Sequence, residues 1–333
     1  LIDKASNKVS FVSGHPITMV CQDLTITAGE FDTGADDVSL TVTGGTVLDG
    51  SAGGEEYSQL QLNGSTVSLG SGITSAAGVQ MSSGGGLYAD ADSTVTMGSL
   101  DANWDGNNEV RLLGTNVIDS YSDNNRILKL TSGVIDTTGT NITITTATTG
   151  KTISCFDTQF GNLTLTPASS TTYNMVSSGI DIGGDLTINA NATLDTTASN
   201  YPLTVTGNTT GAGTLTLNDS TYTGGGHLSM TGTVTIGTSG VITGVDQLGE
   251  SGGTITCTGS PTLGFERWRQ PTANWTPATS TIKLEGHTRA FQTNGYGVPY
   301  NLEIDNSSNT NEMSSTVEVS NNLTITAGTL DTS

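Results

Sequence analysis

One short step recurs along this chain and limits the folds that it can adopt. It reads LTITAGEFDT at residues 24–33 and LTITAGTLDT at residues 323–332. Related versions stand at residues 128–137 and, with one inserted residue, at residues 186–196. Each version joins a short two-faced strand, a small turn and an apolar-Asp-Thr ending. Self-similarity of this kind is typical of a repeat architecture.

A second pattern repeats beside the first. The stretch at residues 150–156 is followed by an aromatic residue and a strand at 160–165, and the stretch at 286–291 is followed in the same way by 300–304. The opening of the chain fits the same phase, because Ile2-Asp3 returns as Ile304-Asp305 at an offset of 302 residues. We therefore expect one repetitive body over residues 1–333, with approximate module restarts near residues 1, 150 and 286. One period of a longer repetitive polypeptide, or a self-stacking subunit, would have this form.

Strict alternation of apolar residues and threonine marks the strands. It is seen at residues 24–27, 40–43, 203–206 and 233–236, where apolar residues face one way and threonines the other. Threonine suits the outer face, because its branched side chain favours strands and its hydroxyl stays in contact with water. No window has an apolar stripe with a period of 3.6 residues, so we expect very little helix.

Short two-faced strands cannot bury their apolar faces alone. Stacking successive coils at about 4.8 Å buries a narrow continuous interior and pairs the backbone from coil to coil. Coils of roughly 20 residues match the length of common structural repeats, and an aromatic content of 5% suits a thin interior. The sequence therefore predicts an all-β fold, a parallel β-solenoid built from imperfect repeats. The alternative is a row of β-sandwich modules, but few Asn-Gly or Asp-Gly pairs stand where tight hairpins would need them.

The charge of the chain excludes some partners. With 10 Lys and Arg against 31 Asp and Glu, the net charge is −21 and the isoelectric point is about 4.1. A polyanion repels nucleic-acid phosphates and anionic lipid. No stretch approaches the roughly 18 apolar residues that cross a bilayer. We expect neither nucleic-acid binding nor membrane insertion, and we expect cations, calcium above all, as natural partners.

Three stretches give the chain a resemblance to a known group. They are NLTITAGTLDTS at 322–333, NATLDTTASNYPLTVTGN at 191–208, and STIKLEG at 280–286 with YNLEIDNSS at 300–308. In these the chain resembles bacterial β-strand-repeat surface proteins, which in turn resemble filamentous-haemagglutinin and autotransporter passenger domains. The resemblance covers most of the chain. It implies an extracellular, right-handed parallel β-solenoid used as a stalk, adhesin or filament, and it implies no catalytic residue.

The sharpest local motif is a candidate calcium loop. Its D-x-N-x-D-G spacing begins at Asp101 and places alternate oxygen ligands around one point, with Gly106 allowing a sharp turn. It departs from the full EF-hand loop, because the twelfth position is Leu112 and no helices are expected to flank it. The alternative is a solvated acidic turn. The candidate metal ligands are Asp101, Asn103, Asp105, Asn107 and Glu109.

An aromatic patch interrupts the repeat. Two of the three tryptophans stand in it beside arginine, in a candidate inserted loop at residues 264–279. Tryptophan and arginine are enriched at binding surfaces, and aromatic faces stack on sugar rings. The alternative is a loop packed against the solenoid. The candidate glycan-binding residues are Trp268, Arg269 and Trp275.

An enzyme reading finds little support in the sequence. Parallel β-helices can cleave polysaccharides through paired carboxylates. Asp36 and Asp37 form the only pair of adjacent aspartates in the chain. The three histidines, at 15, 227 and 287, stand in no recognisable catalytic arrangement, and no nucleophile elbow, phosphate loop or zinc motif is present. We expect no enzymatic activity.

Two sets of residues have expected structural roles. The cysteines continue apolar faces and should be small buried hydrophobes; these are Cys21, Cys155 and Cys257. The aspartates of the recurring step should bond their own backbone in turns; these are Asp136, Asp195 and Asp331.

The sequence thus predicts a structural protein of the cell surface or extracellular space. We expect a subunit or segment of a filament or stalk that associates with itself head to tail, or belongs to a longer parent chain, and is stabilised by calcium. An adhesin that binds glycan through the aromatic patch is the alternative.

Overall fold

The structure is a computed structural model in which the chain forms two compact units, Leu1–Thr171 (unit 1) and Thr172–Ser333 (unit 2). Each unit is described by itself. The structure describes all residues except 1, 11–16, 34–37, 44–45, 50–58, 63–65, 70–78, 83–85, 90, 98, 103–108, 120–125, 131–139, 156–158, 177, 249–251, 269–273, 287–297, 313–316 and 332–333.

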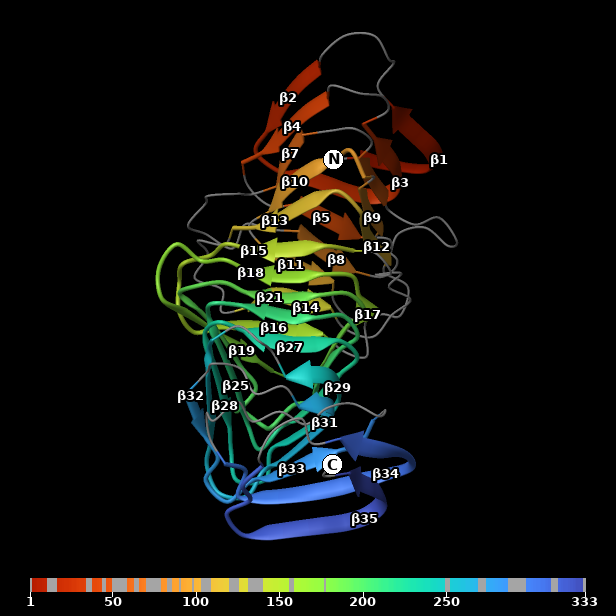
Figure 1. Ribbon diagram of the computed structural model, residues 1–333. Coiled ribbons are helices and arrows are strands. Elements are labelled where there is room, and N and C mark those ends of the chain that lie inside the picture. The colour runs from red at the N-terminus through yellow and green to blue at the C-terminus, as the bar shows by residue number, and fades with distance from the viewer. Residues whose placement is uncertain are drawn as a thin grey trace. The chain divides into compact units, whose positions relative to one another are not determined.

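Unit 1 stacks its strands in parallel ladders (Figure 1). One ladder contains β2 (Ile17–Cys21), β4 (Val38–Val42), β7 (Thr66–Leu69), β10 (Thr94–Met97), β13 (Thr115–Ile118), β15 (Ile142–Ile144) and β18 (Leu163–Leu165). A second contains β3 (Leu24–Asp32), β5 (Thr46–Asp49), β8 (Val79–Ser82), β11 (Leu100–Ala102), β14 (Arg126–Leu130) and β16 (Lys151–Cys155). The third joins β1 (Ile2–Ser10) to β3 and continues through β6 (Gln59–Leu62), β9 (Gly86–Ala89) and β12 (Glu109–Leu112). The short strand β17 (Gln159–Phe160) also belongs to this unit.

Unit 2 has three ladders of the same kind. The first contains β20 (Ile180–Ile182), β23 (Leu203–Val205), β26 (Thr221–Gly224), β29 (Val241–Leu248), β31 (Thr262–Trp268), β33 (Thr281–Leu284), β34 (Asn301–Glu312) and β35 (Asn322–Asp331). The second contains β21 (Leu186–Ile188), β24 (Thr209–Gly211) and β27 (His227–Met230), and ends on the second halves of β29 and β31. The third contains β19 (Thr171–Met175), β22 (Ala192–Asp195), β25 (Thr214–Asn218), β28 (Thr233–Ile236), β30 (Thr254–Cys257) and β32 (Asn274–Thr276).

The register of these ladders gives the length of one coil. In unit 2, Leu203 lies opposite Tyr222 and Val241 lies opposite Thr262. One coil of this unit is therefore roughly 20 residues long, as expected for a short structural repeat. In unit 1 the step from Thr94 to Thr115 is of the same size, and the step from Thr66 to Thr94 is longer.

Every described pairing within either unit is parallel. The predicted parallel β-solenoid is therefore confirmed. The β-sandwich alternative is wrong, because its hairpins would pair strands in antiparallel fashion.

Apolar residues at matching positions form continuous rows inside each unit. Every residue of these rows is at most 1% exposed. One row in unit 1 is Val42, Leu69, Met97, Ile118, Ile144 and Leu165, and one in unit 2 is Ile180, Leu203, Tyr222, Ile242, Leu263, Ile282 and Leu302. The threonines between them face outwards, as the alternation predicts.

The described part of the chain contains strands, turns and bends but no helix, which agrees with the expected scarcity of helix. Consequently, none of the described residues belongs to a long apolar helix that could cross a membrane.

The range 264–279, expected as an inserted loop, contains strand residues in register with the preceding coil. The last part of β31 pairs with β29, and β32 pairs with β30. Residues 269–273 lie between these strands and outside the described part of the chain.

Candidate functional site

The candidate calcium loop is bracketed by two strands of unit 1. Asp101 lies in β11, where the backbone register places it between Gln80 and Lys129 of the neighbouring coils. Glu109 opens β12 opposite Gly86. The other candidate ligands, Asn103, Asp105 and Asn107, lie outside the described residues. The calcium site therefore stays a prediction. Among the described residues, no three His, Cys, Asp or Glu side chains gather as a metal site would require.

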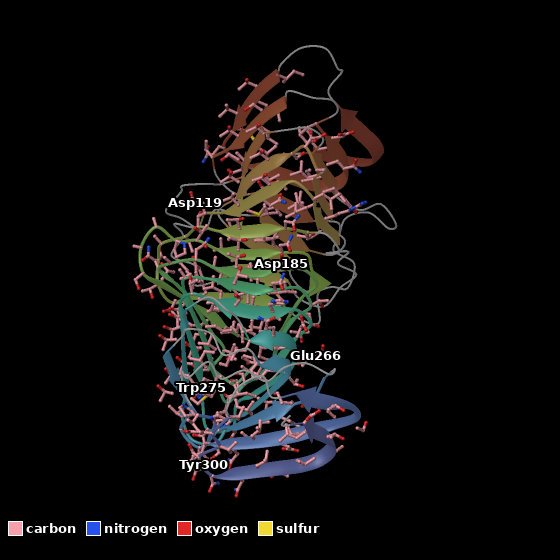
Figure 2. All side chains as sticks on the ribbon, in the orientation of Figure 1. Asp119, Asp185, Glu266, Trp275 and Tyr300 are labelled. Atoms are coloured by element: carbon pink, nitrogen blue, oxygen red, sulfur yellow. The ribbon has the colours of Figure 1, made fainter. Side chains whose placement is uncertain are left out.

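Several carboxylates on described coils accept hydrogen bonds from the next coil. Asp185, labelled in Figure 2, accepts through Oδ1 from the backbone N–H of Asn208 at 2.7 Å. Asp219 Oδ1 accepts from the backbone N–H of Ser239 at 2.8 Å. Asp195 instead accepts from the N–H of Thr197, two residues on, at 2.8 Å. This last bond confirms the predicted turn role of the recurring aspartate. Asp136 lies outside the described residues, and no described bond tests that role for Asp331.

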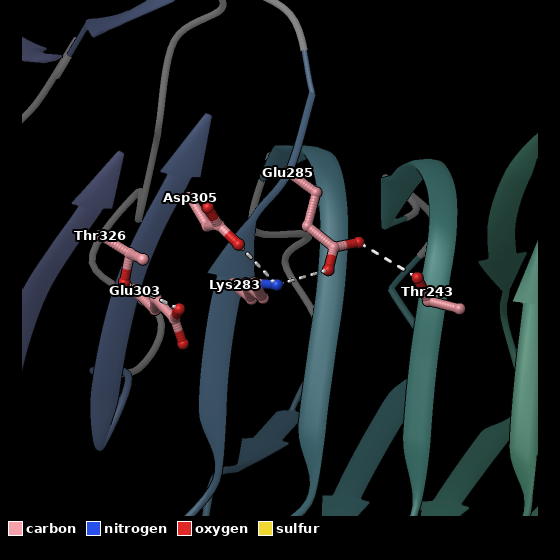
Figure 3. Close-up of polar contacts among 6 residues, drawn as sticks. All are labelled: Thr243, Lys283, Glu285, Glu303, Asp305 and Thr326. Carbon is pink, nitrogen blue, oxygen red and sulfur yellow. Dashed lines mark hydrogen bonds and ion pairs between the residues drawn. The ribbon is translucent and has the colours of Figure 1, made fainter. Parts of the chain in front are cut away.

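A line of polar side chains on the outer face of unit 2 runs from β29 to β35 (Figure 3). The ammonium of Lys283 in β33 lies 2.8 Å from the Asp305 carboxylate and 3.3 Å from that of Glu285. Glu285 also accepts a bond of 3.1 Å from the hydroxyl of Thr243 in β29. Farther along, the hydroxyl of Thr326 in β35 donates to Glu303 at 3.1 Å.

This line of side chains compensates the charge of stacked carboxylates. Hydrogen bonding to Asp305, followed by the smaller effects of Glu285, raises the pKa of Lys283, and burial opposes the rise only in part. The acidic side chains here are therefore offset by an ammonium group and by hydroxyl groups of the protein itself.

Asparagine and aspartate form columns at coil corners. In unit 1, Asn141 Oδ1 accepts from both the backbone and the side-chain amide of Asn162, at 3.2 and 2.7 Å. In unit 2, Asn208 accepts from the backbone N–H of His227 at 2.9 Å, one coil after its own bond to Asp185. Each residue precedes or opens a strand at the same place in its coil. The columns therefore tie successive coils together through side chains.

Threonines at strand ends hold the neighbouring coil in a second way. Both the backbone N–H and the Oγ1 hydroxyl donate to one carbonyl of the neighbouring coil. The threonines that do so, each with its acceptor, are Thr33 with Gln61, Thr43 with Cys21, Thr145 with Ile118, Thr196 with Thr216, Thr231 with Gly211, Thr258 with Ile236 and Thr279 with Gly259. The abundance of threonine was visible in the sequence, but only the coil register reveals this pairing.

The aromatic patch is divided between described and undescribed residues. Trp275 lies in β32 opposite Ile255, which faces the interior, and its indole is half-buried (Figure 2). Trp268 ends β31, and Arg269 lies outside the described residues. The register of Trp275 favours packing against the interior over display as a flat stacking surface.

Of the residues considered for catalysis, the structure describes only His227. Its Nε2 lies 3.1 Å from Asp246 Oδ2, and its side chain is 46% exposed. His15, His287, Asp36 and Asp37 lie outside the described residues. His227 therefore belongs to an exposed corner with one acidic partner, as expected for a surface residue.

The cysteines are free thiols. Cys155 and Cys257 are buried in the interior and Cys21 is partly buried. Burial raises the pKa of all three thiols, that of Cys257 to about 12. The prediction of small buried hydrophobes is confirmed for Cys155 and Cys257.

No protein-family model, curated protein or solved structure matches this chain.

Proposed function

We propose that this chain is a structural protein of the cell surface or extracellular space, a segment or subunit of a filament or stalk. One observation carries the proposal. Within each unit the strands pair in parallel from coil to coil. The interior rows pack along the stacking direction, and the threonine pairs and corner columns form hydrogen bonds along it. A stack bonded in this way gains length and stiffness with every coil. The role is mechanical and needs no catalytic residue.

The location outside the cell is supported by sequence rather than by geometry. The chain resembles bacterial surface repeats in the stretches at 191–208 and 322–333. A net charge of −21 opposes side-by-side association of copies of the chain. Self-association end to end is part of the proposal, because the edge of a parallel stack offers unpaired backbone groups to another chain.

Calcium bracing is the second part of the proposal. Asp101 and Glu109 open the two ends of a loop whose spacing suits a calcium ion, in a chain with three acidic residues for each basic one. Calcium bound there would hold β11 and β12 together across residues 103–108. The ligand set is tested by Asp105→Ala, with Asp92→Ala as the control at an exposed aspartate outside the loop.

Glycan adhesion is the second candidate function. Trp268 ends one strand and Trp275 lies in the next, so the two tryptophans flank Arg269 within one coil. Glycan binding that survives Trp268→Ala would remove this function. Trp275→Ala alone does not decide it, because the half-buried indole packs toward the interior and its loss also lowers stability.

The test of the structural role is assembly of the purified chain. Negative-stain electron microscopy and sedimentation velocity are run over a concentration series, with and without a calcium chelator. We expect filaments that lengthen with concentration and that fray or shorten on chelation, and we expect Asp105→Ala to reproduce the effect of the chelator. Single particles at every concentration would overturn the filament role, and filaments indifferent to the chelator would overturn the calcium bracing.

A further inference from the structure

Two strand pairs, one in each unit, have the same structure. In unit 1, β1 pairs with β3, and in unit 2, β34 pairs with β35. Both pairings contain two irregularities at the same places. The matching contacts are Ile2 with Ile26, Asp3 with Ala28 and Lys8 with Glu30 in unit 1, and Ile304 with Ile325, Asp305 with Ala327 and Thr310 with Thr329 in unit 2.

The sequences of these pairs match as well. β34 follows β1 at an offset of 302 residues, and β35 follows β3 at an offset of 299. Residues 24–33 and 323–332 differ only where Glu30 and Phe31 are replaced by Thr329 and Leu330. The pair β34–β35 is therefore a second occurrence of the pair β1–β3.

In unit 1 the outer edge of β3 is covered. Its first half pairs with β5, which places Ile26 opposite Leu48, and its second half pairs with β6, which places Phe31 opposite Leu60. Under this cover Leu24 is 6% exposed and Ile26 is fully buried.

In unit 2 the equivalent residues of β35 are open. Leu323 is 49% exposed and Ile325 is 50% exposed, and they are two of the three large apolar side chains exposed among the described residues. The same residue types in the same backbone pairing are thus buried in β3 and exposed in β35. The difference between them is the presence of β5 and β6.

We propose that the open edge of β35 binds β5 and β6 of a second copy of this chain, in the register that β3 uses for them. Leu323 then lies opposite Thr46 of the second copy, Ile325 opposite Leu48 and Leu330 opposite Leu60. The pair β34–β35 of one copy takes the place of the pair β1–β3 in the next copy. The junction between copies then has the same strand pairing that β3 makes with β5 and β6 within one chain. This is strand addition to a sheet edge, in which backbone bonds give affinity and alternate side chains fix the register.

The inference rests on the structural role proposed above and names the contact through which that role is carried out. It also differs from simple stacking of blunt ends, because it predicts which residues face one another across the junction. Parallel neighbours in register are close enough for a disulfide between outward-facing positions.

The test joins two copies in one chain, in which residues 1–333 are followed directly by residues 35–333. Cys21 is replaced by serine throughout, Thr324→Cys is made in the first copy and Val47→Cys in the second. The reference is the single chain with Thr25→Cys and Val47→Cys, which already lie opposite one another. We expect the tandem disulfide to form to the same extent as the reference disulfide. We also expect amide exchange in residues 322–325 to slow at least about tenfold relative to the single chain.

The control moves one cysteine by one residue, to Thr46, whose side chain is buried on the opposite face. No disulfide at position 47, or equal yields at positions 46 and 47, would overturn the inference. A tandem chain that fails to fold is replaced by a mixture of two full single chains, one carrying Thr324→Cys and the other Val47→Cys or Thr46→Cys, with Cys21→Ser in both. The same preference for position 47 is expected, and its absence counts against the inference.

The outcome is separable from that of the assembly test. Register-specific cross-linking without filaments removes the filament role and keeps the pairing of β35 with β5 and β6. Filaments without this cross-link keep the structural role and show that another surface joins the copies.

Discussion

At the scale of single residues, polar side chains in the interior fix the position of a coil relative to its neighbours. Asn116 shows this best, because it occupies a row otherwise filled by Leu40, Val67 and Val95. It is 2% exposed, and its side-chain amide donates to the carbonyls of Leu112, Gly114 and Asn141. A buried polar group that makes several bonds fixes one arrangement of its neighbours.

The first prediction concerns this residue. Asn116→Val keeps the shape of the row but removes the side-chain donor to three carbonyls, of which that of Leu112 still accepts from the backbone N–H of Asn141. We expect the variant to lower the free energy of unfolding by about 1–3 kcal/mol. Urea denaturation followed by circular dichroism measures the change. The control is Thr94→Ala on the exposed side of β10, expected to change stability by less than about 0.5 kcal/mol. Equal effects of the two variants would contradict the role given to Asn116.

A buried thiol and a buried phenol give the second prediction, which concerns how stability changes with pH. Burial raises the pKa of Cys257 from 9.0 to about 12, and that of Tyr222 from 10.0 to about 12, although the bond to Thr209 opposes the latter shift. Between these values the unfolded chain loses a proton that the folded chain keeps, so stability falls as pH rises. We expect full stability below pH 9 and a loss of up to about 1.4 kcal/mol per pH unit for each group above its unfolded pKa.

Urea midpoints between pH 7 and pH 11 measure this loss. Cys257→Ala should reduce the slope between pH 9 and pH 10, where the tyrosines of the unfolded chain are still largely protonated. The slope does not vanish, because burial also raises the pKa of the Cys155 thiol. A slope that is unchanged in this variant would contradict the assignment to Cys257.

At the scale of strands and coils, bonds between neighbouring coils take the place that hairpins have in other β-proteins. Residues that bond across coils are far apart in sequence, as the pairing of Leu203 with Tyr222 and of Val241 with Thr262 shows for unit 2. The corner columns and the threonine pairs both use such contacts. Each contributes little alone, but they repeat with the coil and are cooperative along the stack.

A third prediction tests one corner contact. Asp219→Ala removes the acceptor of the Ser239 N–H, and we expect it to lower stability by about 0.5–1.5 kcal/mol. Asp219→Asn keeps an oxygen at the same place, so most of the stability should be retained. Thermal unfolding of the three proteins makes the comparison. Equal losses in both variants would show that charge, and not the bond between coils, is what matters at this corner.

Much of the element pattern could be predicted from sequence, and its limits have physical causes. The alternation at residues 203–206 gave the strand and its buried face correctly, and the recurring step gave the turn bond of Asp195. The contacts of Lys283 with Asp305 could not be predicted, because they join residues of different coils whose register depends on the length of the intervening loop. The candidate calcium ligands Asn103, Asp105 and Asn107 remain predictions, because they lie outside the described residues.

At the scale of the whole molecule, the recurrence that first suggested a repeat also has a structural counterpart. The terminal pairs β1–β3 and β34–β35 share register and sequence, and they differ in what covers them. Because the pair β34–β35 repeats the pair β1–β3, a stack of coils can be extended by this sequence itself. The proposed structural role therefore requires that the assembly grows in the direction in which the coils stack.

X-ray fibre diffraction from the aligned assembly of the purified chain tests this claim most directly. If the ladders provide the length of the assembly, the strands run across the long axis and stack along it. The account then predicts a reflection near about 4.8 Å on the meridian, parallel to the long axis. The same reflection on the equator, or an assembly without one, would contradict it, because the coils would then be stacked across the filament or would not build it at all.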